Sequence, residues 1–217
     1  MNSALKSNSD IKDFGIYVVN DWSAHLDPLL TDAVFDLGFP WYKPDCKLQP
    51  DTFRCAELKF SEPMFEILMM LYQPKDRQFA FKTDSDMHGK SLCRPKGWLT
   101  YDLDGAGRNW LANNLIELKQ ADTVADCFEM MLAGDVDSVS MDEFVGQSSI
   151  KELGIGDKVH TVDTKPISIQ GMHVVVGKEH PQVDEMLALV DKGLANLKAS
   201  GDYQRILDTH MSRIWAD

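Results

Sequence analysis

The sequence predicts an α/β fold, and three observations in its second half carry this prediction. A helical pattern over residues 122–133, a short β-compatible stretch over 136–141 and a second helical pattern over 143–153 follow one another directly. Two extended runs come next, and two amphipathic helices end the chain. Helices alternating with strands are typical of proteins in which helices cover a sheet.

The first of these helices has recognisable start and stop signals. Thr123 and Asp126 have the spacing of a capping box, and Gly134 follows the last turn as a stop. Its apolar residues recur at helical spacing: Val124, Cys127, Phe128, Met131 and Leu132. We therefore expect an amphipathic helix whose apolar face belongs to the core.

Periodicity also defines the rest of the second half. Residues 158–163 alternate with period two and 167–176 end in three valines, so both are expected to be strands. A helix starts at Pro181 and ends at Gly201, and Asp202 can cap the next helix. The apolar stripe of that last helix consists of Tyr203, Ile206, Leu207, Met211 and Ile214.

The first half is less regular. Residues 16–19 and 34–38 are expected to be strands, and residues 25–33 a short helix. A proline-punctuated loop covers residues 40–50. Residues 68–72 and 78–81 are extended by their pattern, and residues 92–94 form a buried strand.

Charge and length narrow the classes of function. The chain has 217 residues, enough for one large domain or two small lobes, and its formal net charge is −12. Nucleic acids and anionic membranes bind clustered Lys and Arg, so neither is an expected partner. No apolar run reaches the ~18 residues that span a bilayer. The start lacks the apolar stretch of a secretory signal, so the chain is either cytoplasmic or without its leader.

Four cysteines argue for an oxidising compartment. Cys46 and Cys55 flank a turn-rich loop and can close a small disulfide ring, and Cys93 and Cys127 can form a second pair. The alternative is four unpaired thiols, because buried free cysteine is common in cytoplasmic proteins. A zinc site is not expected, because the sequence has no CxxC and no HxxxH pair.

Catalytic and cofactor signatures are absent from the sequence. It has no GxSxG, no P-loop and no HExxH motif. Trp110 stands where a dinucleotide fingerprint starting at Gly105 needs its third glycine. Ala106 stands where a calcium loop starting at Asp102 needs an oxygen ligand, and Asn113 where it needs a bidentate glutamate. We interpret residues 102–107 as a solvated turn before a helix, and expect no metal.

The candidate binding groups are loop aromatics and two charged residues. The aromatics lie next to glycine or proline, where such rings line small-molecule pockets or fold back onto the core: Phe39, Trp41, Tyr42 and Trp98. Arg54 suits bidentate capture of a carboxylate, although a single arginine is commonly a surface charge. Asp142 stands between a strand and a helix, a position typical of an N-cap.

Four stretches occur in an order that resembles family 3 solute-binding proteins, which serve amino-acid ABC importers. The run from Arg54 to Pro63 resembles their motif of an arginine, five residues and F-S-x-P. Residues 89–92 with Gly97 resemble the strand opening their second lobe. Residues 132–142 resemble the segment L-x-G-x-V-D-A-V-x-x-D, and residues 201–207 the closing G-x-Y-x-x-I. Together these matches cover residues 20 to 217.

The resemblance implies a two-lobed, type II periplasmic-binding-protein-like fold, α/β with mixed sheets flanked by helices. Lobe one would comprise residues 1–83 and lobe two residues 84–178. Residues 179–217 would form C-terminal helices that pack back across the lobes. The resemblance also implies a monomer in the periplasm that has no enzyme activity and no cofactor, with the membrane permease of an ABC transporter as its partner.

The same resemblance implies a ligand site for an amino acid-like solute. Arg54 would bind the carboxylate and Asp142 the ammonium group, and both charge-assisted bonds strengthen when closure removes water. Gly97 and Trp98 would lie at a helix N-terminus, where backbone N–H groups favour an anion.

The chain departs from the family pattern at the site and at its start. Phe39-Pro40-Trp41 replaces small hydroxyl residues and Gly97-Trp98-Leu99 replaces Gly-Ser/Thr-Thr, so the ligand can differ from a standard amino acid. Almost nothing precedes Ile16, so the first strand of lobe one is expected to be missing. Because that strand lies inside the sheet, its loss exposes unpaired backbone groups and apolar core.

Two alternatives keep the fold and change the role. One is a ligand-sensing module, which differs only in its partner. The other is a cyclohexadienyl dehydratase-like lyase, for which Asp142 and Glu143 are the candidates for a general acid. A truncated chain without a working site is the simplest possibility.

Overall fold

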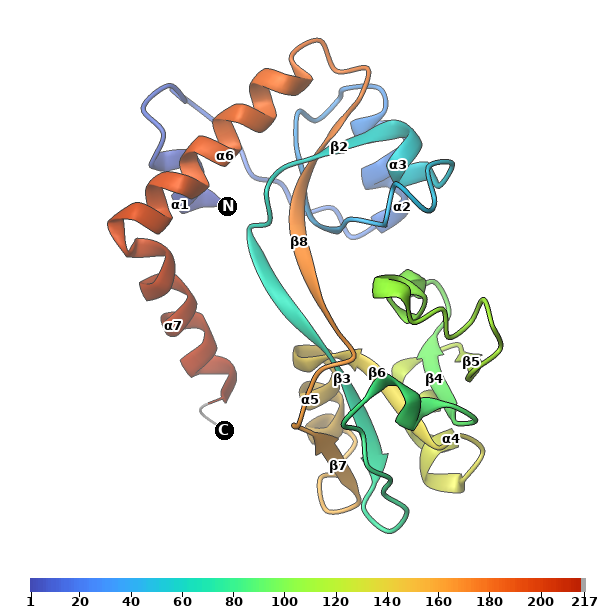
Figure 1. Cartoon of the computed structure of the whole chain (residues 1–217). Helices are drawn as coiled ribbons and strands as arrows, with labels where there is room; N and C mark the ends of the chain where they lie inside the picture. The colour runs from blue at the N-terminus through green and yellow to red at the C-terminus, as the bar shows by residue number, and fades with distance from the viewer. Residues whose placement is uncertain (216–217) are drawn as a thin grey trace. The chain divides into compact units, whose positions relative to one another are not determined.

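A computed structural model of the chain describes residues 1–215, except for the side chains of Trp22, Ala106 and residues 211–215. The stripe positions Met211 and Ile214 therefore lie outside the described side chains. The chain forms two units, one of residues 1–66 and 171–217 and the other of residues 67–170. Two strands run from one unit into the other: β3, Phe65–Pro74, and β8, Ser168–Gly177 (Figure 1). The predicted two-lobed α/β class is confirmed.

The sheet of the first unit is built around β8. The strands β1, Gly38–Tyr42, and β2, Leu58–Phe60, both pair with it in antiparallel orientation, and Val175 is opposite Gly38 on one side and Phe60 on the other. The short helix α3, Phe53–Glu57, leads into β2. The helix α2, Trp22–Ala24, continues into a π-helical segment, His25–Leu30.

The N-terminal helix packs against a long helix from the last part of the chain in the first unit. The helix α1, Asn2–Lys6, lies against the long helix α6, Val183–Ser200, and α7, Asp202–Trp215, follows (Figure 1). The side chain of Asn8 donates to the carbonyl of Leu189 at 2.9 Å. Ala4 and Leu5 are buried in the same apolar cluster as Val190 and Leu194, so α1 contributes to the core.

The second unit has a mixed sheet with a core on each face. The strand β4, Ser91–Pro95, pairs in parallel with β5, Glu117–Ala121, and β6, Ser138–Asp142. The strand β3 pairs in antiparallel orientation with β6 and with β7, Val159–Val162. Because side chains alternate along a strand, Met69 and Leu71 of β3 enter one core cluster and Tyr72 the other.

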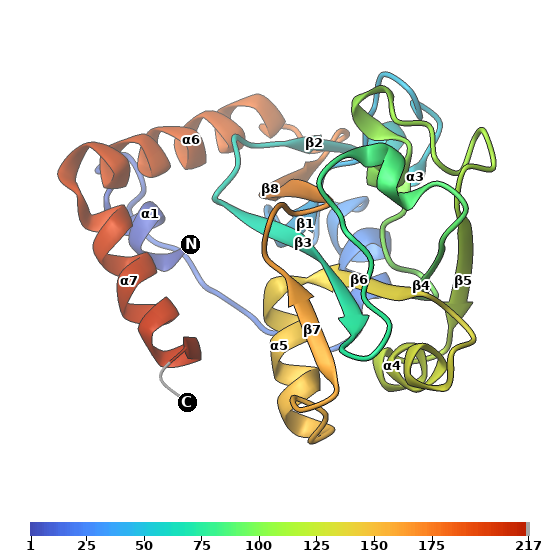
Figure 2. The same ribbon diagram turned by 60° about the horizontal axis from the view of Figure 1, so that its bottom comes forward.

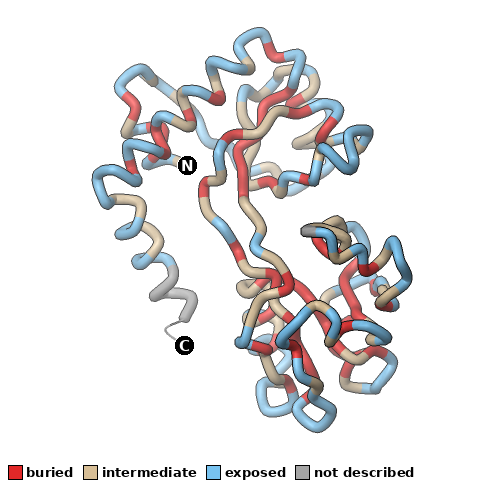
Figure 3. Tube along the Cα trace, viewed as in Figure 1, coloured by how far each residue is buried: buried red, intermediate tan, exposed pale blue. Residues whose placement is uncertain are grey.

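Helices cover this sheet as the sequence predicts. The helix α4, Val124–Ala133, packs against β4 and β5, and α5, Glu143–Glu152, follows β6 directly (Figure 2). Single 3-10 turns occupy Asp84–Met87, Tyr101–Leu103 and Gly105–Gly107. In both units the buried residues follow the strands (Figure 3). No helix within residues 1–215 has the length and apolar character needed to cross a membrane.

The structure differs from the sequence-based expectations mainly in the first half. Residues 16–19 form no strand, because no neighbouring strand pairs with them. The strand expected over residues 34–38 is absent except for Gly38, and β1 extends instead into the residues expected to be a loop, 40–50. Residues 78–81 are also not a strand, and β2, β5 and α3 were not predicted. The chain passes from one unit to the other after residue 66 and after residue 170. The sequence instead predicts that lobe one ends at residue 83 and lobe two at residue 178, because it assigns the apolar run of β3 to lobe one.

Candidate ligand-binding site

Arg54 is held on an aromatic ring in the first unit. Its guanidinium carbon lies 4.9 Å from the ring centroid of Trp41, and its Nη1 donates to the carbonyl of Tyr42 at 3.4 Å. Trp41 is only 5% exposed and packs with Leu30 and Val175. The ring therefore belongs to the core and supports the arginine, and a direct contact of Trp41 with ligand stays a prediction.

Asp142 ends β6 and caps α5 in the second unit. Its Oδ1 accepts hydrogen bonds from the backbone N–H groups of Phe144 at 3.1 Å and Val145 at 2.9 Å, as expected for an N-cap. The residue is 7% exposed. Burial raises the pKa of the Asp142 carboxyl above its usual range, and the two N–H groups oppose this effect only in part. The neighbouring Glu143 accepts from the backbone N–H of Leu68 at 3.2 Å.

Gly97 and Trp98 lie in a turn, and the expected helix N-terminus at these residues is wrong. Gly97 has φ +78°, and the N–H of Trp98 donates to the carbonyl of Pro95 at 3.3 Å. A left-handed glycine reverses the chain here, so a helix cannot start at this position. The half-buried ring of Trp98 packs against the core cluster that contains Tyr72 and Phe128.

A buried ion pair, which sequence reasoning missed, holds this loop. The guanidinium of Arg94 binds Asp102 at 2.6 and 2.9 Å, donates to the hydroxyl of Ser140 at 2.9 Å, and donates to the carbonyl of Leu99 at 2.7 Å. The hydroxyl of Ser168 donates to Asp102 at 2.7 Å. The interpretation of Asp102 as part of a solvated turn is therefore wrong, because Asp102 is 5% exposed and paired with a charge.

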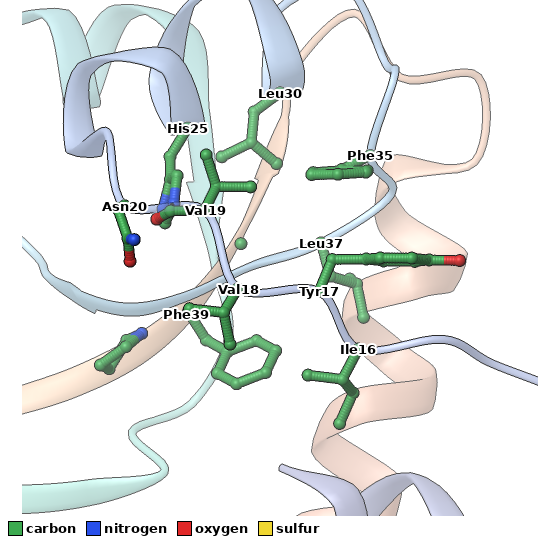
Figure 4. A pocket seen from close by; sticks show the side chains of 12 residues that line it. Ile16, Tyr17, Val18, Val19, Asn20, His25, Leu30, Phe35, Leu37 and Phe39 are labelled. Carbon is green, nitrogen blue, oxygen red and sulfur yellow. The ribbon is translucent and has the colours of Figure 1, made fainter.

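Phe39 is half-buried and lines a cavity of about 310 Å³ in the first unit (Figure 4). The cavity is bounded by residues 16–20 and 37–40, which are mostly apolar. A role for Phe39 in contact with the solute stays a prediction.

Both disulfides expected from the cysteine spacing are present. Cys46 is bonded to Cys55 in the first unit, and Cys93 to Cys127 in the second. The first bond ties α3, which carries Arg54, to the preceding loop. Among the residues that the structure describes, no group of three or more His, Cys, Asp and Glu side chains could hold a metal ion.

Comparisons with known proteins identify solved structures that have the same fold. No protein-family model and no curated protein sequence matches the chain. The GluR0 ligand binding core in complex with L-glutamate aligns with a TM-score of 0.67 and 12% identity over 96% of this chain and 85% of that one. A mutant of ArgBP from T. maritima aligns with a TM-score of 0.62 and 19% identity over 100% of this chain and 84% of that one.

A third solved structure, a binding component of an ABC transporter from Wolinella succinogenes complexed with lysine, aligns with a TM-score of 0.61 and 19% identity over 88% of this chain and 76% of that chain. The TM-scores establish a shared fold, although the sequence identities are low. The chain therefore has the two-lobed α/β fold of the substrate-binding proteins of amino-acid ABC transporters.

Proposed function

We propose that the chain is a solute-binding protein of an ABC importer, and that it binds an amino acid or a similar small carboxylate-bearing solute. The observation that carries this proposal is that each unit holds one charged side chain in a fixed position: Arg54 over Trp41, and Asp142 at the start of α5. An α-amino acid carries the two charges that complement these side chains.

The roles of the residues follow from their chemistry. The planar fork of Arg54 binds the ligand carboxylate with two hydrogen bonds, and Asp142 accepts from the ammonium group through the carboxylate oxygen that does not cap α5. Phe39, Trp98 and Gly97 border the solute, and Trp41 keeps the arginine in place. The comparison proteins that bind arginine, lysine or glutamate support this ligand class.

A thermal melt of the oxidised chain with a panel of amino acids and small carboxylates tests the proposal. A ligand that binds only the folded state raises the free energy of unfolding by about 2.7 kcal/mol when its concentration is a hundredfold above its Kd. Affinity for an ammonium-bearing ligand should rise with pH through the raised pKa of Asp142, because only the ionised carboxyl attracts the ligand.

Two variants locate the site. Arg54→Ala should abolish the ligand-induced shift while the melting midpoint of the free chain changes little, because a partly exposed cation–π contact contributes about 0.5–1 kcal/mol. The matched control is Arg205→Ala, which removes an exposed pair with Asp202 on α7. Unchanged affinity in Arg54→Ala rejects the site, and the absence of any ligand-induced shift rejects the function.

A sensory role is the second candidate, because the GluR0 ligand binding core shares the fold at a TM-score of 0.67. The two roles require the same solute site. The partner distinguishes the two roles. An importer requires a permease that the solute-loaded chain stimulates, whereas a sensor requires a receptor.

A further inference from the structure

One face of the sheet in the first unit carries a second cation besides Arg54. Trp41 of β1 lies opposite His173 of β8 in the antiparallel register, so their side chains are on the same face. Lys43 comes two residues after Trp41 and returns to this face, because side chains alternate along a strand. Its Nζ lies 5.7 Å from the ring centroid of Phe60 in β2, which pairs with the other edge of β8. Lys43 therefore reaches across β8.

Aromatic rings connect the two cations on this face. Phe60 meets His173 edge to face, with ring centroids 5.9 Å apart and planes at 88°. His173 is the register partner of Trp41, and the guanidinium of Arg54 lies 4.9 Å over the Trp41 ring. Lys43 is exposed and Arg54 half-buried, so a solute can reach both. All of these residues belong to the first unit.

The charge of Lys43 is not neutralised by an ion pair. Among the side chains that the structure describes, no carboxylate lies within ion-pair distance of its Nζ. Lys59, which precedes Phe60 and therefore faces the opposite side of the sheet, is paired with Asp184 at 2.7 Å. Lys43 thus keeps its charge available for an anion from solution.

The buried ring of His173 responds to the charge of Lys43. Its Nδ1 donates to the carbonyl of Ser61 at 2.7 Å, and the residue is 8% exposed. Burial lowers the pKa of His173, and the charge of Lys43 lowers it further. The bond to Ser61 and the carboxylates of Glu62 and Asp191 raise this pKa only in part, and α6, which carries Asp191, covers the other face of the sheet. Near neutral pH the ring is therefore uncharged, and Lys43 is the cation beside it.

We propose that the solute carries a second carboxylate and that Lys43 binds it, which narrows the ligand class to amino acids with an acidic side chain. This inference rests on the proposed function, in which Arg54 binds the first carboxylate. A dicarboxylate complements both cations of this face, whereas a neutral side chain leaves Lys43 without an anion and a basic side chain is repelled by it. Lys43 is thus a specificity-determining residue.

The test compares two acids with their amides on the oxidised full chain near neutral pH. Glutamate and glutamine, like aspartate and asparagine, have nearly the same shape and differ by one charge. In the pair whose length fits the site, we expect the acid to bind about tenfold more tightly than the amide, because a hydrogen bond to a charged group is stronger. Titration calorimetry measures both affinities, with arginine and lysine as basic ligands that should bind more weakly than the acid.

Three variants at exposed lysines locate the contact. Lys43→Gln should abolish the preference for the acid and change the affinity for the amide by less than about twofold, because only the acid uses the lysine charge. Lys43→Arg should keep most of the preference. The matched control is Lys47→Gln, which removes the same charge from an exposed lysine of the same unit and should leave the preference intact.

The outcomes separate this inference from the proposed function. Equal affinity for acid and amide in both pairs, tighter binding of a neutral or basic amino acid, or a preference that persists in Lys43→Gln overturns the role of Lys43 and leaves the solute-binding function in place. Absence of binding by every amino acid tested rejects the proposed function, and this inference with it.

Discussion

Two effects with opposite signs act on the pKa of the Asp142 carboxyl: its hydrogen bonds as an N-cap and its burial. As the N-cap of α5 it accepts two backbone hydrogen bonds, which favour the ionised form. Its burial favours the neutral form, and burial has the larger effect, so the pKa is raised. In the absence of ligand this charge destabilises the folded state near neutral pH, and a ligand ammonium group would relieve that cost.

The substitution Asp142→Asn tests this balance. An asparagine keeps the oxygen that caps α5, so the helix start should remain intact. Between the usual aspartate pKa of about 3.9 and the raised pKa, the folded state binds more protons than the unfolded state. The free energy of unfolding of the unaltered chain, relative to Asp142→Asn, should therefore fall as pH rises through that window. Denaturant unfolding at several pH values measures the difference, and a constant or rising difference contradicts the prediction.

At the scale of elements, capping and stop residues in the sequence predicted helix ends well, because these ends depend on residues that are close in the sequence. The capping box of Thr123 and Asp126 and the left-handed Gly134 start and end α4 as expected. Residues 16–19 have strand propensity but no partner strand, and β5 is polar yet forms a strand because β4 pairs with it. Strands depend on neighbours, so sequence patterns predict them less well than helices.

The candidate site divides in the same way. The cap at Asp142 and both disulfides could be predicted, because spacing and residue type determine them. The ion pair of Arg94 with Asp102 could not, because it depends on tertiary contacts with Ser140 and Ser168.

The contact of α1 with α6 gives a prediction for a helical glycine. Replacing glycine by alanine inside a helix normally stabilises by about 1 kcal/mol. A Cβ at position 193 would overlap with the backbone oxygen of Ala4, and Ser7 also donates to the carbonyl of Gly193 at 2.9 Å. We expect Gly193→Ala to destabilise the chain by about 1–3 kcal/mol in denaturant unfolding, because α1 must move away.

Combining Gly193→Ala with removal of residues 1–8 separates the helix propensity of alanine from its overlap with α1. In a chain without residues 1–8 the overlap with Ala4 is absent, so Gly193→Ala should then stabilise by about 1 kcal/mol. The same destabilisation in both backgrounds would mean that the methyl group meets something other than α1.

At the scale of the whole molecule, each unit has its own core and its own cross-link. The clusters around Trp41 and Val190 belong to the first unit, and those around Phe128 and Trp110 to the second. Among the side chains that the structure describes, the buried members of each core cluster all belong to one unit. A lesion in one unit should therefore act first on the stability of that unit.

The two disulfides allow a direct test, because they differ in loop length and burial. Loop-closure entropy gives about 4 kcal/mol for the 34-residue separation of Cys93 and Cys127 and about 2.5 kcal/mol for the 9-residue separation of Cys46 and Cys55. Replacing the first pair by alanines should cost more, also because both cysteines are fully buried. Hydrogen exchange should then show faster opening within residues 67–170 only, whereas alanines at 46 and 55 should affect residues 1–66 and 171–217. Equal loss of protection in both units from either double variant would show instead that the chain unfolds as one cooperative body, since each opening would then report the same global transition.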